Sequence, residues 1–153
     1  MDDTNPQSEP AIRLKSLLKE AGLKSARLDS TRRGIAFPGR AREWLVVARL
    51  NQNWLHLYTF VCNIPEEPGL RARLLEETMH ANAALTLVKF VAGPGLCLEI
   101  DYRAEHLDAS VVGNLVSLLY HAAEEQYPKV FRIVSGDETL RELETSLEVS
   151  EAA

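Results

Sequence analysis

The stretches EWLVVARL (Glu43–Leu50) and WLHLYTFVCNI (residues 54–64), joined by the polar triplet NQN, decide the fold. Both are rich in β-branched and aromatic residues, and a short polar link suits a tight reversal. We therefore predict an antiparallel hairpin, in which side chains alternate between two faces. One face of the second strand then carries Trp54, His56, Tyr58, Phe60 and Cys62, and the other carries Leu55, Leu57, Thr59 and Val61.

Neither face of this predicted strand is plainly polar, so both faces need a cover. We expect helices on one face and something else, such as a second subunit, on the other.

The flanking segments supply the predicted helices and the remaining strands. A helical apolar stripe including Ile12 over residues 10–21, with Ser8 as its cap, predicts a first helix. Residues 26–29 and 34–37 favour a weak strand or hairpin. The sequence PEEP (residues 65–68) ends the predicted strand. After it, apolar residues at helical spacing, which include Met79, predict an amphipathic second helix. Two strands, 85–91 and 96–102, flank a turn rich in glycine and proline.

The most apolar helix is predicted to start at Asp108 or Ser110 and to stop near Gln126, because Tyr127 and Pro128 follow. The expected order is α-β-β-β-α-β-β-α, an α+β fold with an antiparallel sheet of about five strands. We expect a mobile leader over 1–9, one domain over 10–135, and a short helix and tail over 136–153, with Asp137 as the helix cap.

Composition narrows the class of protein. The chain has 153 residues, 17 Lys plus Arg against 22 Asp plus Glu, and a formal net charge of -5. Apolar runs are far shorter than the roughly 20 residues of a membrane span. The acidic balance argues against binding to nucleic acid. These features predict a cytoplasmic protein with neither nucleic acid nor membrane as its partner.

The sequence offers no reactive constellation. The four histidines lack zinc-like spacing, no serine lies in a GxSxG elbow, and Cys62 and Cys97 lie in apolar stretches typical of buried thiols. We therefore predict no catalytic residue, no metal ligand, no cofactor and no enzyme activity. The enzyme alternative would require a cleft that gathers His56, His106 or Asp108 with perturbed titration.

Large apolar residues on strands without a reactive group favour a binding module. The candidate contacts to a partner or to a second subunit are Trp44, Trp54, Tyr58, Phe60, Val112, Val116 and Leu119. The expected assembly is a homodimer that associates through the final helices or through the sheet.

Several phrases carry a family resemblance: LLEETMHANAAL (residues 74–85), LVKF (87–90), GPGLCLEIDY (93–102) and LDASVVGNLVSLLYHAAEEQYPKV (107–130). They resemble the YbjN family of bacterial sensory transduction regulators and the related type III secretion chaperone-like fold. Val88 and Lys89 replace the glycine-containing phrase usual in the family. The resemblance implies a small acidic homodimer that holds unfolded stretches of a cargo protein, and it supplies no catalytic residues.

The sequence therefore predicts a non-enzymatic, chaperone-like or regulatory protein-binding module. The alternative is a signalling regulator that binds a small molecule in a pocket between the sheet and the helices.

Overall fold

A computed structural model of the chain describes residues 8–136. Its elements are α1 (Glu9–Glu20), β1 (Ala26–Arg27), β2 (Arg32–Pro38), β3 (Glu43–Leu50), β4 (Trp54–Cys62), α2 (Pro68–Ala84), β5 (Lys89–Ala92), β6 (Leu96–Arg103), a 3-10 turn (Ala104–His106) and α3 (Ala109–Val134). Most of the predicted leader and the helix predicted from Asp137 lie outside the described residues.

The six strands form one antiparallel sheet in the order β1-β2-β3-β4-β6-β5. The chain leaves β4, passes through α2 and the edge strand β5, and returns as β6 beside β4. The α+β class and the hairpin of β3 and β4 are confirmed. The weak segments near residue 30 form the edge strand β1 and its neighbour β2.

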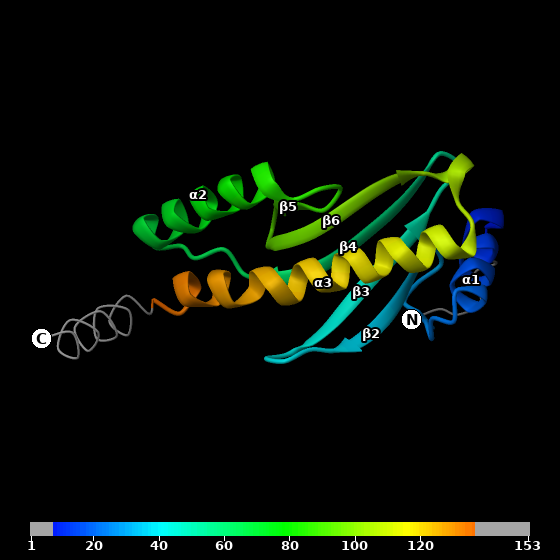
Figure 1. Cartoon of the computed structure of the whole chain (residues 1–153), viewed down its shortest axis with the longest axis horizontal. Helices are drawn as coiled ribbons and strands as arrows, with labels where there is room; N and C mark the ends of the chain where they lie inside the picture. Colours follow the sequence, from blue (N-terminus) through cyan, green and yellow to red (C-terminus); the bar gives the residue numbers. More distant parts are fainter. Residues whose placement is uncertain (1–7, 137–153) are drawn as a thin grey trace, which may run out of the picture.

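The helices cover one face of this sheet. Figure 1 shows α3 running along the strands, with α1 near its start and α2 beside its C-terminal half. On β4, Leu55, Leu57 and Val61 are buried beneath the helices. Val112, Val116 and Leu119 of α3 belong to the same buried core. The opposite face of the sheet, here called the open face, carries no helix among residues 8–136.

The predicted end of the last helix at Gln126 is wrong, because α3 continues through Pro128 to Val134. Proline removes one backbone hydrogen bond and disfavours a helical conformation before it. Packing outweighs this local cost, since Val130 is buried and the ring of Tyr127 meets Trp44 edge-on with centroids 5.4 Å apart.

Two residues placed on apolar helix stripes lie outside the core. Ile12 is 52% exposed and Met79 is 74% exposed. Of the described α2 residues, Leu74 and Thr78 are the ones that become fully buried. The helix contacts α3 and β5 along a narrow line, and a spacing pattern alone does not give the width of a buried face.

Trp44 joins the sheet to α3 through a polar contact. Its indole Nε1 donates a hydrogen bond to Glu124 Oε1 at 2.7 Å, and the Arg40 backbone N–H donates to Glu124 Oε2 at 3.1 Å. The Arg42 guanidinium lies 4.1 Å from the centre of the Trp44 ring. These two hydrogen bonds, that from Trp44 first, hold the pKa of Glu124 below its ordinary value.

This junction leaves no room for a side chain at Gly39. A Cβ there would lie 2.4 Å from the Arg42 carbonyl oxygen and 2.8 Å from Trp44 Nε1, whereas nothing lies within 4 Å of a Cβ at Gly93. We expect Gly39→Ala to lower the free energy of unfolding by about 1–3 kcal/mol. Gly93→Ala, the matched control, should change it by less than about 0.5 kcal/mol. Urea denaturation of both variants checks this, and equal effects would contradict the packing described.

The Glu124 contact also predicts a pH dependence. A carboxyl group whose pKa is lowered in the folded state stabilises the fold above its unfolded pKa, and this stabilisation is lost as the pH falls through the folded pKa. Glu124→Gln keeps an acceptor for Trp44 but has no charge. We therefore expect its free energy of unfolding to fall less steeply than that of the wild type as the pH is lowered below about 4.5.

Urea titrations between pH 3 and 7 measure this dependence. Glu125→Gln is the control, since the Glu125 side chain makes no hydrogen bond within the described part of the chain. Parallel pH profiles of Glu124→Gln and the wild type would show that the Trp44 contact carries no such stabilisation.

Candidate interaction surface

The open face is the candidate functional site. Its side chains come from the same strands that build the core, at the alternate positions of each strand. Arg49 pairs with His56, which pairs with Asp101, and Tyr58 pairs with Glu99 in the next row. The open face is defined by Leu45, Arg49, Trp54, His56, Tyr58, Phe60, Val91, Cys97, Glu99 and Asp101.

One end of the open face is apolar. Leu45, Phe60 and Val91 are each 43–45% exposed, although they lie on a continuous sheet. Phe60 pairs with Cys97, and Cys97 pairs with Val91. A cleft of about 540 Å³ begins here, and its lining includes Phe60, Val91, Pro94 and His56.

Gly95 shapes this end of the face. A Cβ on Gly95 would lie 2.5 Å from the ring of Phe60. The aromatic ring therefore lies directly on the backbone of the turn between β5 and β6, at a distance that only glycine allows.

The other end of the open face is charged. His56 Nε2 lies 2.9 Å from Glu99 Oε1, and its Nδ1 contacts Asp101 Oδ1. The ring is thereby held between two strands. A second cleft of about 340 Å³, lined by Arg49, Asn51, Trp54, His56 and Asp101, adjoins it.

Arg49 of the open face and Arg32, its partner on the neighbouring strand β2, differ in how they are held. Arg32 Nε is 2.6 Å from Asp29 Oδ2, and its Nη1 donates to the Tyr58 hydroxyl at 2.8 Å. The backbone N–H of Thr31 and the side chain of Arg32 hold the pKa of Asp29 well below its usual range. Arg49 is exposed, and no group within residues 8–136 pairs with its guanidinium.

The edge of the sheet at β5 is closed by a side-chain amide. Asn82 Nδ2 donates to the Phe90 carbonyl at 3.1 Å, and the Phe90 N–H donates to Asn82 Oδ1 at 2.7 Å. Lys89 Nζ donates to the carbonyls of Asn82 and Leu85 near the end of α2. The amide satisfies the backbone groups that a neighbouring strand would otherwise use.

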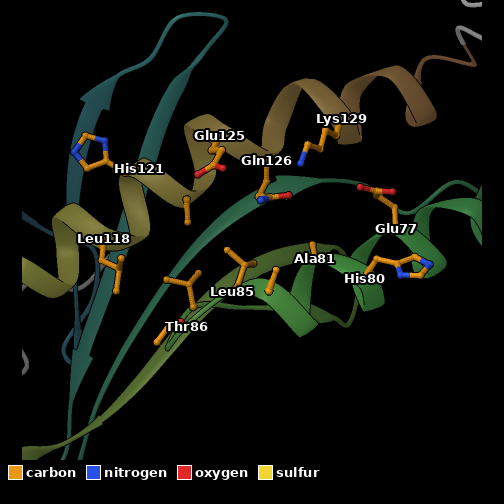
Figure 2. A pocket seen from close by; sticks show the side chains of 13 residues that line it. Glu77, His80, Ala81, Leu85, Thr86, Leu118, His121, Glu125, Gln126 and Lys129 are labelled. Atoms are coloured by element: carbon orange, nitrogen blue, oxygen red, sulfur yellow. The ribbon is translucent and has the colours of Figure 1, made fainter.

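A separate cleft of about 470 Å³ lies between α2 and α3. Figure 2 shows Ala81 and Leu85 from the α2 side, and Glu125, Gln126 and Lys129 along α3. In the described part of the chain, no group of three histidine, cysteine or acidic side chains has an arrangement that would hold a metal ion.

The structure separates the predicted contact residues into two groups. Trp54, Tyr58 and Phe60 lie together on the open face. Trp44, Val112, Val116 and Leu119 are buried in the core of the single chain and do not reach its surface. Arg49, Glu99 and Asp101 were not singled out from the sequence. Charged residues at alternate positions of β6 were the available signal, but their partners depend on strand pairing.

The remaining chemical candidates are not brought together. His56 lies on the open face, whereas Asp108 caps α3 on the covered face and accepts the Val111 N–H at 2.8 Å. Cys62 and Cys97 are half-buried free thiols, and burial raises the pKa of each. A thiol with a raised pKa is a poor nucleophile.

Comparison of the chain with solved structures identifies its fold as that of type III secretion chaperones. A chain of the crystal structure of the ExsC-ExsE complex matches with a TM-score of 0.55 and 18% identity, covering 77% of this chain and 93% of the other. A chain of the HopA1-SchA chaperone-effector complex gives a TM-score of 0.55 at 8% identity, covering 75% and 90%. The heterodimeric ExoU-SpcU complex from the type III secretion system of Pseudomonas aeruginosa gives 0.52 at 15% identity, covering 77% and 94%.

The sequence matches no protein-family model and no curated protein. The structural matches confirm the chaperone-like fold expected from the resemblance. The resemblance to the YbjN family gains no support from sequence comparison. Among the described helices, none is long and apolar enough to cross a membrane.

The Asn82 contact generates a stability prediction. Asn82→Ala leaves the Phe90 N–H and carbonyl without their partner, which should lower the free energy of unfolding by about 1–3 kcal/mol. It should also increase aggregation, because the edge of β5 becomes free to pair. Asn114→Ala, an exposed position on α3, is the control. Denaturation and light scattering measure both effects, and an Asn82 variant as stable and soluble as the control would refute the capping role.

Proposed function

We propose that this protein is a non-enzymatic, chaperone-like module that binds another protein through the open face and acts as a homodimer. The observation that carries the proposal is the exposure of Trp54 and Phe60, 43% and 44%, on the central strand β4. Strands in the middle of a sheet usually bury such rings, and exposed aromatic residues on a rigid surface are typical of protein interfaces.

The shape of the open face supports a protein partner. Its two clefts share His56, so together they follow β4 from Phe60 to Trp54. A long, shallow surface of this kind suits an extended polypeptide better than a compact ligand.

The structural neighbours support the same class of partner. One is a complex of a chaperone with an effector, and another is a heterodimer from a type III secretion system. By analogy, we propose that the partner is a protein held in a partly unfolded state. This role implies that the protein works in the cytoplasm.

A second surface supports the proposed homodimer. Leu118 of α3 lines the cleft between these helices and is 38% exposed, and Leu87, which is 51% exposed, lies between the lining residues Thr86 and Val88 just after α2. This surface is separate from the open face. A second copy bound there would leave the residues of β4 free for the partner.

The alternatives have less support. A ligand pocket between the sheet and the helices would need space that Leu57, Leu98 and Leu119 fill. An enzyme that uses His56 and Asp108 would need both groups on one side of the sheet, whereas they lie on opposite faces.

Substitution of the exposed rings tests the binding role. We expect Phe60→Ser and Trp54→Ser to reduce capture of the partner from extract of the native cell at least tenfold, because each removes a large apolar contact. Ile12→Ser is the matched control, since Ile12 is 52% exposed but lies on α1. Pull-down with quantitative mass spectrometry measures capture, and light scattering gives the oligomeric state.

Equal losses for all three variants, or no loss for any of them, would place the binding surface elsewhere. A monomeric wild type at micromolar concentration would contradict the homodimer.

A further inference from the structure

Arg49, whose guanidinium has no partner within residues 8–136, lines one of the two clefts of the open face. Asn51, Trp54, His56 and Asp101 line the same cleft of about 340 Å³. Asp101 is the carboxylate of this cleft, and it already accepts a hydrogen bond from His56. No group within residues 8–136 forms a hydrogen bond or an ion pair with the Arg49 guanidinium, although the Asp101 carboxylate lines the same cleft.

The neighbouring groups do not supply a hidden partner for Arg49. Arg32, its partner in the register of β2 and β3, is held by Asp29 and Tyr58. Glu99 contacts His56 one row further along the sheet. The guanidinium of Arg103 lies 5.5 Å from the centre of the Trp54 ring, so a second cation borders the cleft.

The two ends of the open face have a fixed separation. Arg49 and Leu45 are exposed on the same side of β3, four residues apart. His56 lies next to Arg49 in the register, and Phe60 lies four residues further along β4 on the same side, directly after Thr59, the partner of Val46. At about 3.3 Å per residue, the charged and apolar ends are therefore roughly 13 Å apart along the strand.

We propose that the open face selects an extended segment of the partner protein in which an acidic residue and a large apolar residue are four positions apart. The carboxylate pairs with Arg49, and the apolar side chain lies against Phe60 and Leu45. Side chains of an extended chain alternate, so residues i and i+4 face the sheet together. A guanidinium binds a carboxylate through two parallel hydrogen bonds, which favours an acidic side chain over a neutral one.

This inference deepens the proposed function, because it names the chemistry of the partner at the same surface. The probes are fluorescein-labelled peptides with the core Glu-Thr-Val-Thr-Phe and, since either chain direction fits the spacing, Phe-Thr-Val-Thr-Glu. Peptides with Gln in place of Glu remove the charge. A peptide with Glu and Phe three positions apart places the two side chains on opposite sides of an extended chain.

Fluorescence polarisation with the full-length protein measures binding. We expect one of the Glu peptides to bind the wild type about three- to tenfold more tightly than its Gln counterpart, and more tightly than the peptide with the shorter spacing. The preference for Glu should shrink when NaCl is raised from about 50 mM to about 500 mM. Arg49→Gln should abolish this preference, and Arg49→Lys should retain part of it.

Arg71→Gln, an exposed arginine on α2, is the control for the loss of one positive charge. Equal binding of Glu and Gln peptides to the wild type, or a preference for Glu that survives in Arg49→Gln, overturns the carboxylate site. Absence of binding by every peptide also overturns it.

The proposed function is judged separately. Binding of the Gln peptide that is lost in Phe60→Ser supports the open face as a protein-binding surface even if the Arg49 site is wrong. Unchanged capture of the native partner by Phe60→Ser contradicts the proposed function, binding of a protein through the open face.

Discussion

The structure depends on the packing of β4 against α3. Leu55, Leu57 and Val61 are buried on one side of this strand, so the intervening residues must point to the other side. A slip of one residue would bring His56 and Tyr58 into the core and expose the leucines. The free energy of core burial thus fixes both the register and the arrangement of the open face.

This coupling explains which parts could be predicted from the sequence. The alternation in β4 is local, so the hairpin and the grouping of Trp54, His56, Tyr58 and Phe60 on one face follow from it. The exposure of Trp54 and Phe60 does not follow, because neither face of this strand is plainly polar. The contact of His56 with Glu99 and Asp101 joins residues more than 40 positions apart. Residue types at that distance do not specify which strands become neighbours, and here α2 and β5 intervene before β6 pairs with β4.

The two kinds of error have a common physical cause. The sequence analysis predicts that the last helix ends before Pro128. The contacts of Tyr127 and Val130 with the core outweigh the lost backbone hydrogen bond, so the helix continues. Val112, Val116 and Leu119 were candidates for contact with another molecule, yet α3 buries them within the chain. In both cases tertiary packing decides, and a local pattern does not contain the partner that supplies it.

The rigidity of the open face follows from how its polar groups are satisfied. His56 is held by two carboxylates and Arg32 by Asp29 and Tyr58, so these side chains have little freedom left to lose when a partner binds. Arg49 makes no such contact, and ordering its long side chain costs entropy that a new pair of hydrogen bonds must offset. The proposed pairing with a carboxylate therefore contributes more to the choice of partner than to affinity. In the proposed complex, the apolar contacts at Phe60 and Leu45, on a sheet that is already rigid, would supply most of the binding free energy.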